Sequence, residues 1–345
     1  MRSGLVVPVL AALTTLAAAP SRADDVAQFY AGRTISLTTG YGAGGSYDTG
    51  ARLIARHMGK YIPGKPGFVV STMTGAGGIT LFNHLYNAAP KDGTALGMSG
   101  RGLYLEALFG NPVVKFDPLK FNWIGSHARE VNVLVTGAKA PFKTVEDIRA
   151  NEVILSASSP GADTYSYALI VRAFTDAKIK IVSGFQSQPD AFLAIDRGEV
   201  HGNAGATVGT LMALRPQWLK EPGHANFILQ ITTQRHPKFY QGVPLIMDFA
   251  KNEIDRQALV LALARQNIAY AFTAPPGVPA NRIKALRDAF EAMVKDPEFL
   301  AEAERMSTDV APVSGDGVAD VIRQAYAMPP AVLERAKAAL SVGKD

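Results

Sequence analysis

Residues 39–48 read T-G-Y-G-A-G-G-S-Y-D, and the fold is inferred from this stretch outward. A run of β-forming residues precedes it at 34–39, and a helical pattern with apolar and basic faces follows it at 52–60. A strand, a glycine-rich loop and a helix in this order direct unpaired backbone N–H groups and the positive end of the helix dipole toward one point. We therefore interpret the stretch as a corner that holds a carboxylate; an ordinary strand-to-helix turn is the alternative.

The sequence Gly-Ala-Gly-Gly occurs twice, at 42–45 and 75–78, each time between β-forming residues and a helical pattern. Strands and helices alternate along most of the chain, which indicates parallel α/β sheets. We expect both corners at the carboxyl edge of one sheet, where open α/β sheets bind ligands. Further small polar loops at 156–164 and 203–209 indicate a second α/β lobe, with the ligand cleft between the two lobes.

The composition narrows the possible functions. Of the 345 residues, 48% are hydrophobic and 19% charged, as in ordinary globular proteins of about two domains. The net charge of +5 is not concentrated in a basic cluster, so we expect no nucleic-acid partner. There is no cysteine, and the six histidines form no H-E-x-x-H motif and no i, i+4 pair. We therefore expect no disulfide, no metal and no cofactor.

The first residues are typical of a signal peptide. Arg2 supplies the positive charge, residues 5–19 are apolar, and small residues precede a cleavage position after Ala23. The apolar stretch contains Pro8 and is too short to span a bilayer, although a short N-terminal membrane anchor is the alternative. We expect export to the periplasm, with a mature chain that begins at Asp24.

The order of three motifs resembles the solute receptors of tripartite tricarboxylate transporters, the TctC or Bug family. The motifs are Gly-Ala-Gly-Gly-Ser-Tyr-Asp at 42–48, Thr-Gly-Ala-Gly-Gly at 74–78 and Ala-Ala-Pro-Lys-Asp-Gly-Thr-Ala-Leu at 88–96. Ala-Pro-Pro-Gly-Val-Pro at 274–279 and Asp-Pro-Glu-Phe at 296–299 also fit the family pattern. The resemblance covers essentially the whole mature chain.

The resemblance implies an α/β periplasmic binding protein of type II, the Venus flytrap, with a mainly parallel sheet in each lobe. It implies a monomer without enzymatic activity that captures a small carboxylated organic anion, such as a di- or tricarboxylate, and delivers it to membrane permease subunits. We expect chain crossings near 126–131 and 227–233, about which the lobes close. The expected division is a signal peptide at 1–23, a first lobe at 24–128 and 231–345, and a second lobe at 129–230.

The candidate ligand-binding residues lie on the expected loops of both lobes. They are Tyr41, Gly44, Gly45, Ser46, Asp48, Ala76, Gly77, Gly78, Ser99 and Arg101 in the first lobe, and Ser158, Ser159, Gly161, Thr164, Asn203 and Thr207 in the second. Arg101 is the best candidate for an ion pair with a carboxylate, and a surface arginine is the alternative. Asp48 either complements the helix dipole or orients a bridging water. Tyr41 either covers the ligand or packs within its lobe, and the hydroxyls either cap helices or bind.

The chain departs from the family pattern where ligand contacts would lie. Met73-Thr74 replaces an Arg-Pro or similar pair, and G-A-D-T-Y at 161–165 replaces a Gly-Ser-Thr-Thr-His-like run. N-A-G-A-T at 203–207 lacks the acidic residue that is common there. These differences leave the fold prediction intact and leave the substrate open.

Two other functions are compatible with parts of the sequence. Gly40, Gly42 and Gly45 match G-x-G-x-x-G, the fingerprint of dinucleotide-dependent oxidoreductases. That function needs an acidic residue at the end of the next strand, and V-V-S-T-M at 69–73 has none. A periplasmic ligand-sensing receptor without a transport role is the other alternative, and the sequence does not separate it from a transport receptor.

Overall fold

The computed structural model describes residues 22–98, 100–158, 160, 162–185, 187–236, 240–306, 308 and 310–341. Residues 1–21 of the expected signal peptide lie outside the described residues, as do the candidate ligand residues Ser99, Ser159 and Gly161. The expected cleavage position, after Ala23, falls within helix α1 (Arg22–Tyr30). Within the described ranges, no helix combines the length and the apolar character needed to cross a bilayer.

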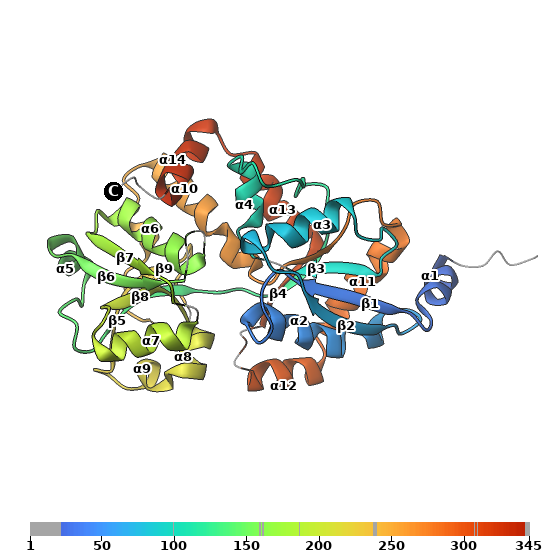
Figure 1. The fold of residues 1–345 in the computed structure, drawn as a ribbon, viewed down its shortest axis with the longest axis horizontal. Helices are drawn as coiled ribbons and strands as arrows, with labels where there is room; N and C mark the ends of the chain where they lie inside the picture. Colours follow the sequence, from blue (N-terminus) through green and yellow to red (C-terminus); the bar gives the residue numbers. More distant parts are fainter. Residues whose placement is uncertain are drawn as a thin grey trace, which may run out of the picture.

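The first lobe is organised around a six-stranded sheet with the order β11-β4-β10-β3-β1-β2 (Figure 1). Strand β1 pairs in parallel with β2 and β3, whereas β10 is antiparallel to β3 and β4, and β11 is antiparallel to β4. The strands are β1 (Thr34–Thr39), β2 (Gly67–Thr72), β3 (Ala95–Met98), β4 (Asn122–Ala128), β10 (Phe272–Ala274) and β11 (Val310–Ser314).

Helices cover both faces of this sheet. One face packs against α1, α2 (Ser46–His57), α11 (Ala280–Met293) and α12 (Pro297–Arg305), and the other packs against α3 (Ile79–Asn87), α4 (Leu103–Leu108) and α13 (Gly315–Tyr326). Two short 3-10 helices, η1 (Gly59–Tyr61) and η2 (Ala76–Gly78), follow α2 and β2. Coverage of both faces agrees with the burial of the central strand β4, where six of the seven residues are buried.

The second lobe has a five-stranded sheet with the order β7-β6-β8-β5-β9. Its strands are β5 (Asn132–Gly137), β6 (Val153–Ala157), β7 (Ile179–Ser183), β8 (Gly202–Thr207) and β9 (Ala225–Ile231). Its helices are α5 (Val145–Ala150), α6 (Asp163–Thr175), α7 (Gln188–Arg197), α8 (Val208–Leu214) and α9 (Pro216–Lys220). Successive residues of β5 enter opposite cores, Leu134 on the α6 side and Val133 on the α7 side, as the two-residue period of a strand requires.

Both sheets are mixed, whereas we expected mainly parallel ones. In the second lobe β6 is parallel to β7 and β8, but β5 is antiparallel to β8 and β9. The physical reason is the connectivity. A strand followed by a crossover helix must return parallel to its neighbour, but a strand reached by crossing from the other lobe is not bound by this rule.

The chain passes from the first sheet to the second between β4 and β5, at residues 128–132; the prediction was a crossing near 126–131. After β9 it stays beside the second sheet, where η3 (Ile246–Phe249) contacts β9 and α10 (Glu253–Leu263) packs on α6. The return occurs at η4 (Ala264–Ile268), which contacts β4. Helix α14 (Pro330–Leu340) also packs on α10 and α6 (Figure 1). The expected boundary at residue 231 and the crossing near 227–233 therefore differ from the structure, because α10 and α14 complete the core over α6.

Close packing between β4 and α11 gives a test of this fold. A Cβ atom at Gly125 would lie 2.2 Å from the ring of Phe290, which is fully buried. We expect Gly125→Ala to lower the free energy of unfolding by about 1–3 kcal/mol, as measured by urea denaturation. Gly42→Ala is the matched control, because nothing lies within 4 Å of the Cβ position there. Equal stability of the two variants would contradict the packing described.

Candidate functional site

Two cavities lie between the lobes, and Arg101 lines both of them. The first cavity, of about 320 Å³, is lined by the first turns of α2, the crossing segment at 127–132, the start of α6, and the β8–α8 corner. The second cavity, of about 510 Å³, is lined by Tyr41, the 76–77 corner, residues 100–113 and the first turns of α6. Each cavity has walls from both lobes, which is the arrangement that a ligand cleft requires.

The two Gly-Ala-Gly-Gly corners lie side by side, as expected from the sequence. They follow β1 and β2, which are adjacent and parallel, and the Tyr41 hydroxyl donates a hydrogen bond of 3.1 Å to the carbonyl oxygen of Gly77. Gly44, Gly77 and Gly78 have φ values of +80°, +64° and +97°, a backbone region that favours glycine. The glycines are thus needed for the sharp turns that bring these corners together.

Asp48 stabilises the first corner and lies outside both cavities. Its carboxylate is buried and accepts hydrogen bonds of 2.9 Å from the Gly44 N–H and of 2.9 Å from Arg52 Nε. These hydrogen bonds, from Arg52 first and from the Gly44 N–H, hold the pKa of Asp48 below its usual value. The structure places Asp48 as an anchor of the glycine turn, at the start of α2.

Arg101 is buried rather than exposed, and two carboxylates of the chain already neutralise it. Its guanidinium is paired with Glu130, and its Nε lies 2.9 Å from Asp163 Oδ2. Its backbone N–H also donates a hydrogen bond of 3.2 Å to the Tyr47 hydroxyl. A ligand carboxylate that approached Arg101 would therefore lie beside two acids that already neutralise this arginine and would be repelled by them.

We define Arg101, Glu130, Asp163 and Arg265 as the interlobe ion cluster. Asp163 Oδ1 lies 3.4 Å from Arg265 Nη1, and Glu130 also accepts a hydrogen bond of 2.7 Å from the Tyr270 hydroxyl. Arg101 follows β3 of the first lobe and Asp163 begins α6 of the second, while Glu130 and Arg265 lie on the two crossings of the chain. The cluster has no net charge and joins both lobes to both crossings.

Stacked rings form the first-lobe wall behind this cluster. Tyr41 stacks on Tyr47 with ring centroids 4.7 Å apart, Tyr47 lies 5.4 Å from Tyr270, and Tyr270 lies 4.9 Å from His127. Burial lowers the pKa of His127 to about 4, so this ring is neutral at physiological pH. His127 and Tyr270 are the two rings of this group that line the first cavity, and because burial also raises the pKa of Tyr270, both are uncharged there.

The candidate residues predicted from the sequence are divided between the cavities. Ser46, Thr164 and Thr207 line the first cavity with Arg101, and Tyr41, Ala76 and Gly77 line the second. Among the described candidates, those that line neither cavity are Gly44, Gly45, Asp48, Gly78, Ser158 and Asn203.

Two of these candidates hold the second-lobe loops in place. The Asn203 side chain is buried, donates to the Ser156 carbonyl oxygen at 3.1 Å and accepts from the Gly205 N–H at 2.7 Å. The Ser158 N–H donates to the Thr164 hydroxyl at 3.0 Å. Asn203 therefore shapes the β8–α8 corner, and the Ser158–Thr164 bond connects the loop to α6.

Several residues of the site were not among the sequence candidates. They include Thr49, Arg129, Glu130, Asp163, Gln188 and Tyr270, all of which line the first cavity. A signal for some of them was present, since Arg129 and Glu130 fall on the expected first crossing. Asp163 stands in the loop that departs from the family pattern.

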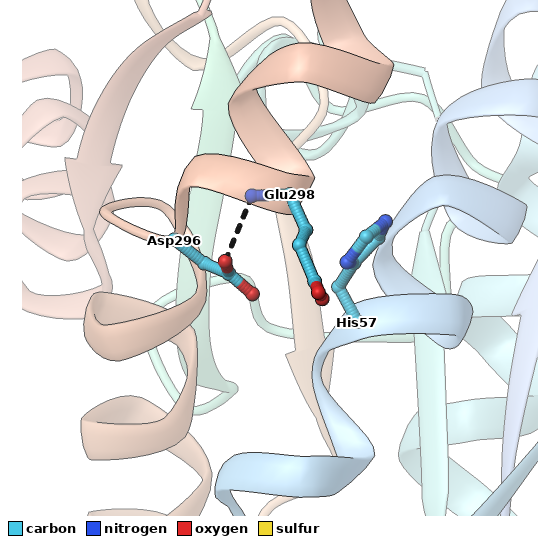
Figure 2. A group of neighbouring side chains, drawn as sticks. All are labelled: His57, Asp296 and Glu298. Atoms are coloured by element: carbon cyan, nitrogen blue, oxygen red, sulfur yellow. Dashed lines mark hydrogen bonds between the residues drawn. The ribbon is translucent and has the colours of Figure 1, made fainter.

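One group of side chains elsewhere has the composition of a metal site. His57, Asp296 and Glu298 approach one another between α2 and the start of α12 (Figure 2). The Lys60 ammonium, however, lies 2.5 Å from Asp296 and 2.7 Å from Glu298, and His57 Nε2 lies 2.6 Å from Glu302. Lys60 therefore supplies the positive charge in this group, which joins α2 to α12.

Comparison with known proteins gives the class of the protein. No protein-family model matches the chain. A UPF0065 protein of Cupriavidus necator is 26% identical over 293 residues, covering 82% of this chain and 81% of the relative. A TctC solute-binding protein from Polaromonas, solved without ligand, has a TM-score of 0.64 at 19% identity, covering 86% of this chain and 96% of its own.

Two further structures contain bound acids. An R. palustris protein with adipate has a TM-score of 0.66 at 17% identity, over 89% of this chain and 97% of its own. MatC from Rhodopseudomonas palustris, with bound malate, has a TM-score of 0.63 at 18% identity, over 89% of this chain and 99% of its own. The fold is therefore that of the two-lobe periplasmic binding proteins. The chain is similar to the TctC and Bug receptors in particular, which confirms the resemblance predicted from its motifs.

The interlobe ion cluster gives the second prediction. Asp163→Asn removes the second-lobe acid that pairs with Arg101, so we expect the lobes to separate more readily and the radius of gyration in small-angle X-ray scattering to increase. Asp196→Asn is the matched control, because Asp196 pairs with Arg215 within the second lobe, at 2.8 Å. A radius of gyration that is the same in Asp163→Asn and the wild type would contradict a role for the cluster in closure.

The ion pairs of Lys60 with Asp296 and Glu298 give a prediction on the pH dependence of stability. The hydrogen bond from Lys60, with that from the Glu298 N–H, lowers the pKa of Asp296 to about 2. A carboxyl group whose pKa is depressed in the folded state stabilises the protein at pH values above its unfolded-state pKa, which is near 4. This stabilisation is lost as the pH falls toward 2. We expect the melting temperature of Asp296→Asn to be below that of the wild type at pH 7, and the difference to shrink between pH 4 and 2. Asp288→Asn, on the exposed face of α11, is the control; a difference independent of pH would contradict the assignment.

Proposed function

We propose that this chain is an extracytoplasmic solute-binding protein that captures a small carboxylated organic anion between its lobes. In this proposal it delivers the anion to the permease subunits of a tripartite tricarboxylate-type transporter. It acts as a periplasmic monomer, after export and cleavage behind Ala23, and has no enzymatic activity. The observation that carries the proposal is the first cavity, which is lined by residues of both lobes and of the crossing between them.

The chemistry of the first cavity supports an organic acid of modest size. Its volume of about 320 Å³ is at the lower end of the usual range for small-molecule sites. Its walls present hydroxyl and amide groups from Thr49, Gln188 and Thr210, together with arginine side chains. The structural neighbours with adipate and malate hold organic acids, and a small carboxylated acid is likewise proposed for this chain.

Closure couples ligand binding to the arrangement of the lobes. A ligand shifts the open and closed populations only as far as it binds one of them more tightly. Because both lobes line the cavity, a ligand gains its full set of contacts only when the lobes are together. The Arg101–Asp163 pair joins the first lobe to the second, so the ion cluster and the ligand both favour lobes that are together.

Different observations distinguish the proposed transport receptor from a sensing receptor and from an oxidoreductase. A sensing receptor would bind the same ligand in the same cavity, and loss of organic-acid uptake on deletion of the gene would favour transport. A dinucleotide-dependent oxidoreductase would need an acid after β2. Met73 follows that strand, and Asp48, the acid nearest the glycine loop in sequence, is engaged with Gly44 and Arg52.

Titration calorimetry with the mature protein tests the proposed function. We expect heat of binding from at least one acid among succinate, malate, adipate, citrate and benzoate, and none from glucose or cadaverine. Thr49→Trp, which fills the first cavity from α2, should abolish this heat while the protein remains folded. Binding confined to neutral or cationic compounds would contradict the proposal.

A further inference from the structure

The charged residues that line the first cavity differ in whether they have an ion-pair partner. Apart from histidines, the described charged residues in its wall are Arg101, Arg129, Glu130 and Asp163. Arg101, Glu130 and Asp163 belong to the interlobe ion cluster, in which two arginines balance two acids. Neither acid of the wall therefore lacks a cation, and Arg101 does not lack an anion.

Arg129 differs from the other three charged residues. It lies on the crossing segment between β4 and β5, is exposed, and lines the first cavity. Its guanidinium forms no ion pair or hydrogen bond with any residue that the structure describes. The neighbouring acid, Glu130, is directed instead to Arg101 and to the Tyr270 hydroxyl.

We propose that Arg129 is the residue that pairs with the carboxylate of the ligand. We further propose that the first cavity takes an acid with one ion-paired carboxylate, whose other polar groups meet neutral donors and acceptors. This inference rests on the proposed function and adds a specificity-determining residue to it. The interlobe ion cluster and Arg129 together carry a net charge of +1, which a single carboxylate balances.

The ligand carboxylate pairs with Arg129 rather than with Arg101 because Arg101 already has two acidic partners, whose displacement costs free energy. A carboxylate that approaches Arg101 either lies beside Glu130 and Asp163 and is repelled by them, or displaces one of them from a partly buried pair, and such losses are costly. A carboxylate that approaches Arg129 displaces only water. Closure of the lobes then lowers the effective dielectric constant around the new pair and strengthens it.

Neutral groups near Arg129 define what the rest of the ligand meets. Thr49, Gln188 and Thr210 line the same cavity with hydroxyl or amide groups. The Gln188 amide nitrogen donates to the Gly205 carbonyl oxygen at 3.2 Å, and its amide oxygen can accept a further hydrogen bond. Hydroxyl, amide or protonated carboxyl groups of the ligand fit these partners better than a second carboxylate.

The test uses three compounds of one shape in titration calorimetry with the mature protein. Adipate has two carboxylates, its monoamide has one, and its diamide has none. We expect wild type to bind the monoamide at least as tightly as adipate, and the diamide about tenfold or more weakly. In Arg129→Gln, adipate and the monoamide should each lose about tenfold or more in affinity, with the diamide unchanged. Arg129→Lys should retain part of the affinity for the two acids.

Arg197→Gln is the matched control, because Arg197 is an exposed arginine at the end of α7, outside both cavities. Melting temperatures of all variants establish that they are folded. Equal affinity of Arg129→Gln and wild type for the acids would overturn this inference and leave the proposed function standing, as would tenfold weaker binding of the monoamide than of adipate. Wild type that binds neither these compounds nor succinate, malate, citrate or benzoate would overturn the proposed function and the inference with it.

Discussion

The interlobe ion cluster is the interaction on which the arrangement of the two lobes depends. Charges taken out of water are tolerated only when they are paired and hydrogen-bonded, and Arg101 meets this condition only if Glu130 and Asp163 are brought to it. One of these acids lies on a crossing of the chain and the other on the second lobe. The cluster therefore links the burial of one arginine to the relative position of the two lobes.

The same cluster divides the space between the lobes. Arg101 and Asp163 line both cavities and lie between them. The crossing segment borders the first cavity, and Tyr41 and the 76–77 corner border the second. Tyr41 and Asp48 form hydrogen bonds within these corners, which gives them a structural role next to any role in binding. The chemistry available to a ligand thus differs between the cavities, with the guanidinium of Arg129, which pairs with no described residue, at the first.

Much of the fold could be predicted because local signals agreed with the tertiary structure. The repeated Gly-Ala-Gly-Gly sequence, each time between strand and helix, placed both corners at one sheet edge, and β1 and β2 are indeed adjacent and parallel. The second crossing could not be predicted, because the segment after β9 has no local feature that distinguishes packing on α6 from packing on the first sheet. Thr164 and Thr207, two candidates that line the first cavity, were predicted through the same strand-to-helix signals.

The sequence by itself determined the two-lobe α/β class, the glycine corners and the resemblance to the TctC and Bug receptors. The lobes and corners follow from periodicity and from backbone requirements, which act over a few residues, and the resemblance rests on the order of the motifs. Only the tertiary structure decided which charged side chains pair with one another. The sequence shows Arg101, Glu130 and Asp163 as three separated charged residues, and their pairing depends on the meeting of two lobes and a crossing segment. Electrostatic partners are set by distance in space, so the order along the chain could not show that Arg101 pairs with two acids while Arg129 pairs with no residue that the structure describes.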